Sequence, residues 1–327
     1  MPRTFNPPAR FVIDSPSGAA LNVRAFAPTG EPVAVLLLFH GLAEHSARYE
    51  RTARDLATLG ITTYVHDHRG HGSTTAHDAP LRRFAKRDGV RKILRDCHAV
   101  RERAQRDLAD LPVFVLGHSL GGAIALHYAR RYGGGLSGCL VWNAGMRFGW
   151  QTRLGSGALK VEKMLKGSDV ASLVFARATF EAWARTVPNR RTDADWLTHD
   201  PAIADAYMRD PLCGWTPTVS MAEDILVLIR DNASHEALSQ IPHDLPIHCL
   251  GGTLDPATEG GAEVKRLAER LREAGSREVE LTIVEGARHE TLNEVDPFRA
   301  QALDALEAFV ERHLDTPPAR PTTVEPD

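Results

Sequence analysis

The stretch Val113-Phe114-Val115-Leu116-Gly117-His118-Ser119-Leu120-Gly121-Gly122 decides how the rest of the chain is interpreted. An apolar run typical of a buried strand leads into Gly-x-Ser-x-Gly, and the apolar residues 123–129 that follow are typical of a helix. In a strand–turn–helix of this kind, the serine occupies a sharp turn that only small neighbours permit. Its hydroxyl stands at the carboxyl edge of the sheet, and the first N–H groups of the helix point toward the reacting atom. Ser119 is therefore the candidate nucleophile.

The composition of the chain limits the classes of protein to consider. With 327 residues it has room for one large domain, or for one domain carrying a long insertion. A net charge of −3 gives no reason to expect nucleic acid as a partner, and no apolar run is long enough to span a membrane. Residues 1–8 lack the hydrophobic core of a signal peptide, so the expected location is the cytoplasm. The four cysteines form no Cys-x-x-Cys pair, which predicts neither a zinc site nor a disulfide framework.

Strands alternate with helices on both sides of the Ser119 motif. A hairpin of edge strands is expected first, and the continuous apolar run 33–39 then predicts a strand buried on both faces. The alternation is typical of an α/β fold with a mostly parallel sheet of eight strands flanked by helices. The expected strands are 11–14, 21–26, 33–39, 61–65, 113–116, 136–142, 246–252 and 279–284, and the clearest helices are 48–59, 88–108, 262–274 and 298–313.

The alternation breaks between residues 146 and 233, where helical segments follow one another. All five tryptophans lie between 142 and 215, which suits a small subdomain with its own core, a cap over an apolar pocket, or both. We interpret 146–233 as a helical cap inserted into a core made of residues 1–145 and 234–315. The proline-rich residues 316–327 are expected to be a disordered tail.

A serine hydroxyl needs a base to accept its proton and an acid to orient that base. His289 follows the last expected strand in a Gly-Ala-Arg-His turn, and Asp255 follows the strand after the insertion. Ser119, Asp255 and His289 therefore come in the chain order used by strand-end triads on sheets of this kind.

Three other carboxylates compete with Asp255 for the acid role. Asp231 is expected within a helix, and Glu285 lies only four residues before His289, where it suits a loop anchor better. Asp244 is the third rival. The transition state also needs N–H donors for its oxyanion, and we assign these to the backbone of Leu120 and of Leu42, in the loop that follows the strand 33–39.

The histidines of His66-Asp67-His68-Arg69-Gly70-His71 support a different hypothesis. His66, His68 and His71 suggest a metal-dependent hydrolase, although no clean set of further ligands is visible elsewhere. The plainer interpretation is that Asp67 and Arg69 hold this loop near the active site. A third hypothesis is a non-catalytic binding protein on the same fold.

Four motifs resemble the monoacylglycerol lipase and lysophospholipase-like branch of the α/β-hydrolases. They are His40-Gly41-Leu42-Ala43-Glu44-His45-Ser46-Ala47-Arg48-Tyr49, Asp67-His68-Arg69-Gly70-His71-Gly72-Ser73, Gly117-His118-Ser119-Leu120-Gly121-Gly122 and Gly286-Ala287-Arg288-His289-Glu290. The resemblance runs from about residue 10 to 314. Within the expected cap, 192–197 and 210–215 are similar to bacterial members called lysophospholipases.

The resemblance implies an α/β-hydrolase fold and a serine carboxylic-ester hydrolase that needs no metal or organic cofactor. It implies the triad Ser119, Asp255 and His289, with Leu42 and Leu120 as oxyanion donors. The expected substrate is a monoacylglycerol or another single-chain acyl ester, with lysophospholipase, short-chain carboxylesterase and thioesterase as alternatives. The expected partners are this small molecule and, at most, a transient membrane contact through the cap. A monomer or a small homo-oligomer is expected.

Overall fold

Strand β3 (Ala34–Phe39) lies inside the sheet, as its continuous apolar run predicts. The structure is a computed structural model that describes residues 9–147 and 149–320. All six residues of β3 are buried, and the strand pairs in parallel with β4 (Ile61–His66) on one side and β6 (Val113–His118) on the other. The strand that leads to Ser119 is thus adjacent to the strand that leads to Leu42.

The other strands extend the sheet to both edges in the order β1-β2-β4-β3-β6-β7-β8-β9. The pairs β1–β2 and β2–β4 are antiparallel, and every later pair along this path, from β4–β3 to β8–β9, is parallel. This path contains the eight expected strands. A ninth, β5, pairs with β2 and has only two residues, too few to produce a periodic pattern in the sequence. The bounds are β1 (Arg10–Asp14), β2 (Ala19–Phe26), β5 (Thr75–Ala76), β7 (Gly138–Trp142), β8 (Ile247–Gly252) and β9 (Val279–Val284).

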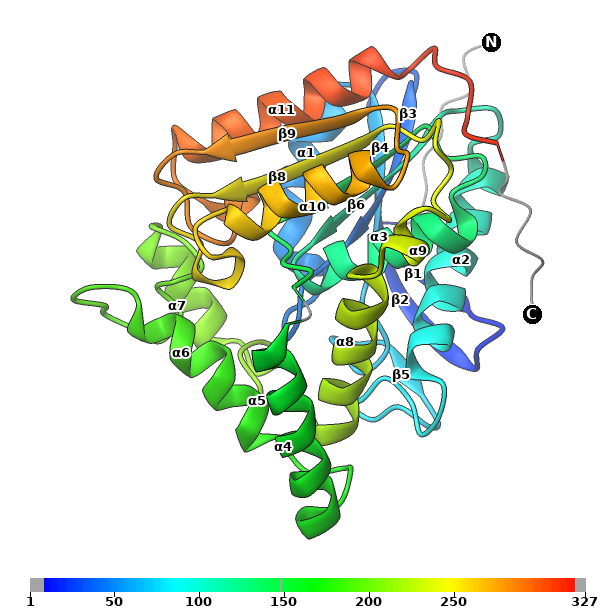
Figure 1. The fold of residues 1–327 in the computed structure, drawn as a ribbon. Helices are drawn as coiled ribbons and strands as arrows, with labels where there is room; N and C mark the ends of the chain where they lie inside the picture. Colours follow the sequence, from blue (N-terminus) through cyan, green and yellow to red (C-terminus); the bar gives the residue numbers. More distant parts are fainter. Residues whose placement is uncertain (1–8, 148, 321–327) are drawn as a thin grey trace.

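Two layers of helices cover the two faces of the sheet (Figure 1). Alternate residues of β3 face different layers, because successive side chains of a strand point to opposite faces. Leu36 and Leu38 pack in a cluster with α1 and α11, whereas Val35 and Leu37 pack in the larger cluster with α2, α3 and α10. These helices are α1 (Glu50–Thr58), α2 (Gly89–Asp107), α3 (Leu120–Tyr132), α10 (Ala262–Glu273) and α11 (Phe298–Arg312), and the 3₁₀ turns are η1 (Ser46–Tyr49), η2 (Pro256–Thr258) and η3 (Thr291–Asn293).

In the described part of the chain, six helices connect β7 to β8 and, drawn in green to yellow, lie mostly together at one end of the sheet (Figure 1). The first five, α4 to α8, fall within residues 146–233 and α9 follows them, but α8 also packs against α2 and α3 and contributes Met221 and Leu228 to the larger core cluster. Their bounds are α4 (Trp150–Lys166), α5 (Leu173–Ala178), α6 (Phe180–Arg185), α7 (Pro201–Arg209), α8 (Val219–Asn232) and α9 (His235–Leu238).

The tryptophans of this region occupy different environments. Trp196 belongs to a separate cluster with residues of α6 and α7, and Trp183 packs against it. Trp215 belongs to the larger core cluster, and Trp142 lies within β7 itself. Trp150, at the start of α4, is 66% exposed. The aromatic side chains therefore build a local core and also leave apolar surface at the outside of α4.

The expected disordered tail is partly ordered. Ala319 is buried, its N–H donates to the carbonyl of Leu136, and its carbonyl accepts from Gly135. The expectation was wrong for residues 316–320, because these backbone bonds fix the chain against the loop before β7. Residues 321–327 of that segment, and residues 1–8 at the amino end, lie outside the described residues. In the described part of the chain, no helix is long and apolar enough to cross a bilayer.

Candidate active site

Ser119 occupies a strained turn between β6 and α3. Its backbone has φ 54° and ψ −115°, a conformation that a non-glycine residue adopts only when its surroundings enforce it. The Ser119 N–H donates to the carbonyl of Trp142 at 2.9 Å, and its hydroxyl forms no capping bond to α3. The hydroxyl is therefore held at the amino end of α3 and is available to a side chain from another loop.

The glycines of the motif allow this turn to pack against the neighbouring backbone. A Cβ on Gly117 would lie 2.0 Å from the carbonyl oxygen of Gly121, and a Cβ on Gly121 would lie 2.0 Å from that of Phe39. A Cβ on Gly122 would lie 2.7 Å from the Ala144 side chain. Any side chain at these positions would displace α3 from β3 and β6, so the small residues are required by the close approach of backbones.

The structure brings Ser119, His289 and Asp255 into one chain of hydrogen bonds. His289 Nε2 lies 2.9 Å from Ser119 Oγ, and His289 Nδ1 lies 2.8 Å from Asp255 Oδ1. Each residue follows a different parallel strand: Ser119 comes after β6, Asp255 after β8 and His289 after β9. The carboxyl ends of parallel strands meet at one edge of the sheet, which explains how residues 170 positions apart come into contact.

Asp255 is fully buried and is surrounded by hydrogen-bond donors. Its Oδ1 also accepts the Ala257 N–H at 2.9 Å. Its Oδ2 accepts from the Thr258 hydroxyl at 2.9 Å and from Asn143 Nδ2 at 3.3 Å. These bonds fix the carboxylate in the orientation in which it accepts from His289.

Burial and neighbouring charge shift the pKa values of Asp255 and His289 in opposite directions. Burial alone would raise the pKa of Asp255, but the neighbouring His289 and the donors around the carboxylate hold it below its usual value. Burial alone would lower the pKa of His289, but the Asp255 carboxylate raises it above its usual value. The pair therefore favours a basic imidazole, which is what a general base for a serine hydroxyl requires.

The three rival carboxylates lie elsewhere. Asp231 is in α8, as expected, and pairs with Arg230. Asp244 accepts from the backbone of Arg320 at 3.4 Å. Glu285 is in the turn after β9, and it is Asp255 that hydrogen-bonds His289.

The backbone N–H groups of Leu42 and Leu120 are the donors expected for the oxyanion. Leu42 follows β3, Leu120 is the first residue of α3, and both line the same cavity as Ser119. Within the described part of the chain, neither N–H has a protein acceptor. A first-turn N–H of a helix, such as that of Leu120, is normally left without an intrahelical partner, and the loop N–H of Leu42 is also untaken, so both groups can donate to an anion in this cavity.

The loop after β4 braces the loop that carries Leu42. Asp67 accepts the Ser46 N–H at 2.8 Å, and the His68 N–H donates to His40 Nε2 at 2.9 Å. Since Nε2 of His40 is an acceptor, its Nδ1 carries the proton and donates to the Gly41 carbonyl at 2.7 Å. Arg69 is fully buried and donates to Asp96 at 2.6 Å. Asp67 and Arg69 thus have the bracing contacts that the sequence predicts.

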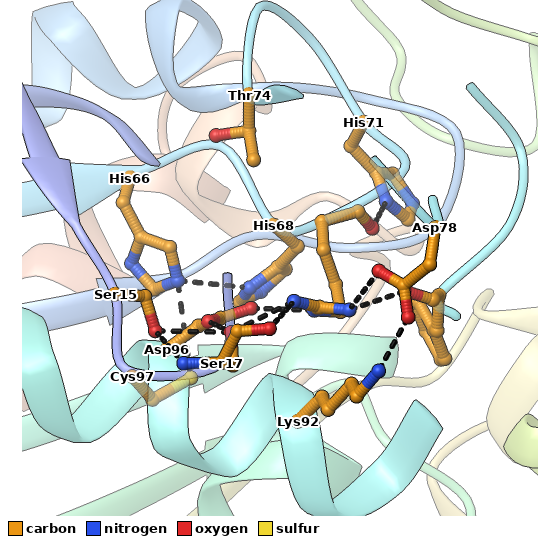
Figure 2. A network of polar contacts seen from close by, with 12 residues as sticks. Ser15, Ser17, His66, His68, His71, Thr74, Asp78, Lys92, Asp96 and Cys97 are labelled. Carbon is orange, nitrogen blue, oxygen red and sulfur yellow. Dashed lines mark hydrogen bonds and ion pairs between the residues drawn. The ribbon is translucent and has the colours of Figure 1, made fainter. Parts of the chain in front are cut away.

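The histidines of the alternative metal hypothesis do not gather as a set of three. Figure 2 shows the His66 and His68 rings close to Cys97, with His71 apart. His66 Nε2 lies 3.1 Å from His68 Nδ1 and 3.8 Å from the Cys97 sulfur, whereas the His68 and His71 rings are 6.2 Å apart. All four side chains are buried, and none is among the described residues that line the cavity of Ser119. The ligand atoms of His66, His68 and Cys97 lie within 4.8 Å of one another, so the group that gathers contains a cysteine in place of His71 and lies away from Ser119.

Buried histidines predict a loss of stability in mild acid. Burial lowers the pKa of His66 and of His118 to about 3, and that of His127 and of His248 to about 4. An unfolded histidine titrates near pH 6.5, so below that pH the unfolded state binds more protons and is favoured. We expect each of these histidines to cost about 2 kcal/mol of stability at pH 5 relative to pH 7.5. His289, with its raised pKa, acts in the opposite direction and offsets only part of the loss.

Urea unfolding between pH 5 and 7.5 measures this loss. The variant His66→Gln should have a shallower dependence of unfolding free energy on pH, and the same change at the exposed His77 should leave the dependence as in the parent. A free energy of unfolding that does not vary across this range would contradict the expectation.

One cavity of about 420 Å³ extends from Ser119 to helices α4, α5, α6 and α8. One wall is apolar and comes from α4, α5 and α8, with Leu159, Phe175, Ile225 and Ile229 among its residues. Trp183 and Trp196 stand beside His289, and the Trp196 ring centroid is 4.9 Å from that of the imidazole. The cavity therefore joins the reactive residues to an apolar space.

Charged side chains also line the cavity. Glu44 and Glu290 line it, and Arg48 donates to both, at 2.7 Å to Glu44 and at 2.5 and 2.6 Å to Glu290. Burial alone would raise the pKa of Glu44, but Arg48 lowers it below its usual value. The Arg48 guanidinium also lies 4.9 Å from the Tyr207 ring. This part of the lining is polar, negatively charged and rigidly held.

Sequence reasoning missed several residues of the site. Asn143 directly follows β7, so the same strand-end rule that selected Asp255 also points to it. Glu44 and Arg48 lie within the motif after β3 and received no role. Glu290 adjoins His289, and only the fold reveals that it meets Arg48. No sequence signal distinguishes Trp183 and Trp196 from the other tryptophans.

Comparisons with known proteins agree with this fold. Residues 30–296 match the family model described as serine aminopeptidase, S33. The chain is 27% identical over 297 residues to the monoacylglycerol lipase of Mycolicibacterium smegmatis, a match that covers 91% of this chain and 95% of that one. It is 26% identical over 305 residues to the monoglyceride lipase of Rattus norvegicus, covering 93% and 90%. A thermostable carboxyl esterase from Bacillus coagulans has the same fold, with a TM-score of 0.82 at 24% identity over 93% of this chain and 98% of that one.

Proposed function

Because the chain belongs to the serine aminopeptidase S33 family of α/β-hydrolases, we propose that Ser119, His289 and Asp255 are the catalytic triad of a carboxylic-ester hydrolase acting on monoacylglycerol-like esters. The single observation that carries the assignment of the triad is the chain of hydrogen bonds from Ser119 Oγ through His289 to buried Asp255. Ser119 and His289 line a cavity that has an apolar wall, and such a wall can hold the acyl chain of an ester.

The reaction proceeds in two halves. Ser119 Oγ attacks the ester carbonyl while His289 Nε2 takes its proton, and the carbonyl oxygen becomes an oxyanion held by the Leu42 and Leu120 N–H groups. The tetrahedral intermediate collapses, the alcohol leaves with the proton from His289, and the acyl group stays on Ser119. Water then attacks the acyl-enzyme while His289 takes its proton, and the second intermediate collapses as His289 returns that proton to Ser119 Oγ and the fatty acid leaves. Asp255 keeps the His289 proton on Nδ1 throughout, and no metal or cofactor takes part.

The apolar and the charged parts of the cavity lining support a substrate with one acyl chain and a small polar alcohol. The apolar wall of α4, α5 and α8 fits the chain, since burying each methylene is worth about 0.8 kcal/mol. The part that holds Glu44 and Glu290 fits hydroxyl groups, because carboxylates accept hydrogen bonds. A glycerol ester of one fatty acid presents both features.

A panel of substrates tests this proposal, with the Ser119→Ala variant as the blank. Monoacylglycerols, lysophospholipids, acyl thioesters, short-chain nitrophenyl esters and aminoacyl anilides are compared by kcat/KM. The proposal expects monoacylglycerols to be the best substrates and hydrolysis to depend on Ser119. Preference for lysophospholipids or thioesters would correct the substrate, and turnover of aminoacyl anilides without any ester would overturn the proposed activity.

We also propose that the outer face of α4 makes transient contact with membranes. Five of its apolar side chains are more than half exposed, and three of them lie among lysines in the last two turns of the helix. A helix with exposed apolar and basic residues binds at the surface of an anionic bilayer. The apolar residues are Trp150, Leu154, Val161, Met164 and Leu165, and the lysines are Lys160, Lys163 and Lys166.

Sedimentation with vesicles of phosphatidylcholine and phosphatidylglycerol tests this contact. We expect the parent chain to sediment with these vesicles and the double variant Leu154→Gln, Met164→Gln to remain in solution, since two of the exposed apolar side chains are removed. A matched change on a different helix, exposed Met208→Gln of α7, should leave binding unchanged. Equal binding of all three proteins would rule out α4 as the contact surface.

A further inference from the structure

Helix α4 contains two glycines in its interior, Gly155 and Gly157. Glycine is among the least favourable residues inside a helix, so its use at two close positions calls for a reason. The two positions differ in their surroundings. Gly155 lines the cavity of Ser119, as do Thr152 three residues before it and Leu159 four residues after it. Residues at this spacing share one face of a helix, so Gly155 is on the face toward the cavity.

Gly157 lies on the other side of the helix. It is exposed, is not among the described residues that line the cavity, and shares its face with the exposed Leu154 and Val161. The two glycines therefore weaken the same helix, but only one of them faces the substrate.

Close packing does not explain the glycine at position 155. A Cβ there would meet no neighbouring atom within 4 Å, whereas a Cβ on Gly121 of the Ser119 turn would lie 2.0 Å from a backbone oxygen. Gly155 also lies within regular helix, where every residue type can adopt the backbone conformation. Because residue 155 has no side chain, the cavity has free space there, in a lining that also includes Leu159 and the apolar residues of α5 and α8.

We propose that Gly155 determines the length of acyl chain that the enzyme accepts. The inference rests on the proposed ester hydrolysis at Ser119 and adds that the far part of the chain occupies the space beside Gly155. A side chain at this position would fill that space and exclude long chains, while a short acyl group between Ser119 and the near part of the wall would still fit. Gly155 is thus a specificity-determining residue that takes no part in the chemical steps.

The test compares kcat/KM for p-nitrophenyl palmitate and butyrate, in the same detergent, for the parent and three variants. Gly155→Leu should lower the palmitate-to-butyrate ratio at least about 10-fold, because one misplaced methylene in an apolar pocket already changes kcat/KM about 10- to 200-fold. Gly157→Gln removes the other interior glycine with a side chain of similar size, adds no apolar surface to the outer face, and should leave the ratio unchanged. Gly155→Leu combined with Leu159→Ala should recover part of the ratio by reopening the cavity.

The outcomes separate this inference from the proposed function. An unchanged ratio in folded Gly155→Leu, or an equal fall in Gly157→Gln, would overturn the role of Gly155, since the second result means that stiffening of α4 is responsible. Recovery in the double variant is expected only if the filled volume is the cause. A parent enzyme that hydrolyses neither ester would instead overturn the proposed function. Melting temperatures of all variants establish that each is folded.

Discussion

Replacing Ser119 by alanine is expected to lower kcat for an acyl ester by a factor of about 10⁶, the size of effect seen when a serine-triad nucleophile is removed. Without Oγ no acyl-enzyme forms, and the Leu42 and Leu120 N–H groups can stabilise only the attack of water. The fold should be unaffected, because the turn at residue 119 is held by the backbone bond to Trp142 and by the neighbouring glycines. Steady-state kinetics on the best ester of the panel measures the effect.

Ser73→Ala is the matched control for this variant. Ser73 is an exposed serine in the loop that braces residues 40–46, and its contact with Asp67 is made by the backbone N–H. The control should keep the kcat of the parent enzyme. A Ser119→Ala enzyme that retained more than about one hundredth of the activity, against the expected factor of about 10⁶, would place the nucleophile elsewhere.

Replacing Asp255 by asparagine is expected to lower kcat by about 10⁴-fold. Asparagine keeps the size of the side chain but can present its NH₂ group to His289 Nδ1. The imidazole then carries its proton on Nε2, where it cannot accept from Ser119 Oγ. The buried carboxylate also raises the pKa of His289, and His289 must be neutral to act as a base. Activity of the parent is therefore lost as pH falls through this raised pKa, and the acidic limb of kcat/KM should move to lower pH in the variant.

The rival carboxylates provide controls for Asp255→Asn. Asp244→Asn and Glu285→Gln remove the charges that compete with Asp255 in the sequence, and both should leave kcat and its pH dependence unchanged. If either control lost as much activity as Asp255→Asn, the acid would be misassigned in spite of the 2.8 Å contact between Asp255 and His289.

The sheet and the positions of the site residues were predictable because short-range signals specify them. Continuous apolar runs mark buried parallel strands, and side chains that follow those strands meet at one edge of the sheet. Ser119, Asp255 and His289 each follow such a strand, which is why three residues far apart in sequence were selected together. Asn143 obeys the same rule and was available to the same reasoning.

Other features depend on contacts that no local pattern encodes. The bond from Arg48 to Glu290 joins residues 242 positions apart, and only the fold brings them together. The order of residues 316–320 comes from two backbone bonds between Ala319 and the loop before β7, although a proline-rich composition favours disorder. The sequence predicts α8 as part of the insertion. The helix nevertheless packs on α2 and α3, because one of its faces is apolar and joins the core.

Covalent labelling by a fluorophosphonate tests the central claim most directly, namely that Ser119 is a nucleophile activated by His289. The reagent phosphonylates an activated serine, and intact-mass spectrometry followed by peptide mapping locates the adduct. We expect one adduct, on the peptide that contains Ser119, slower labelling of Asp255→Asn, and no labelling of Ser119→Ala. An adduct on another residue, or labelling that persists in Ser119→Ala, would contradict the account.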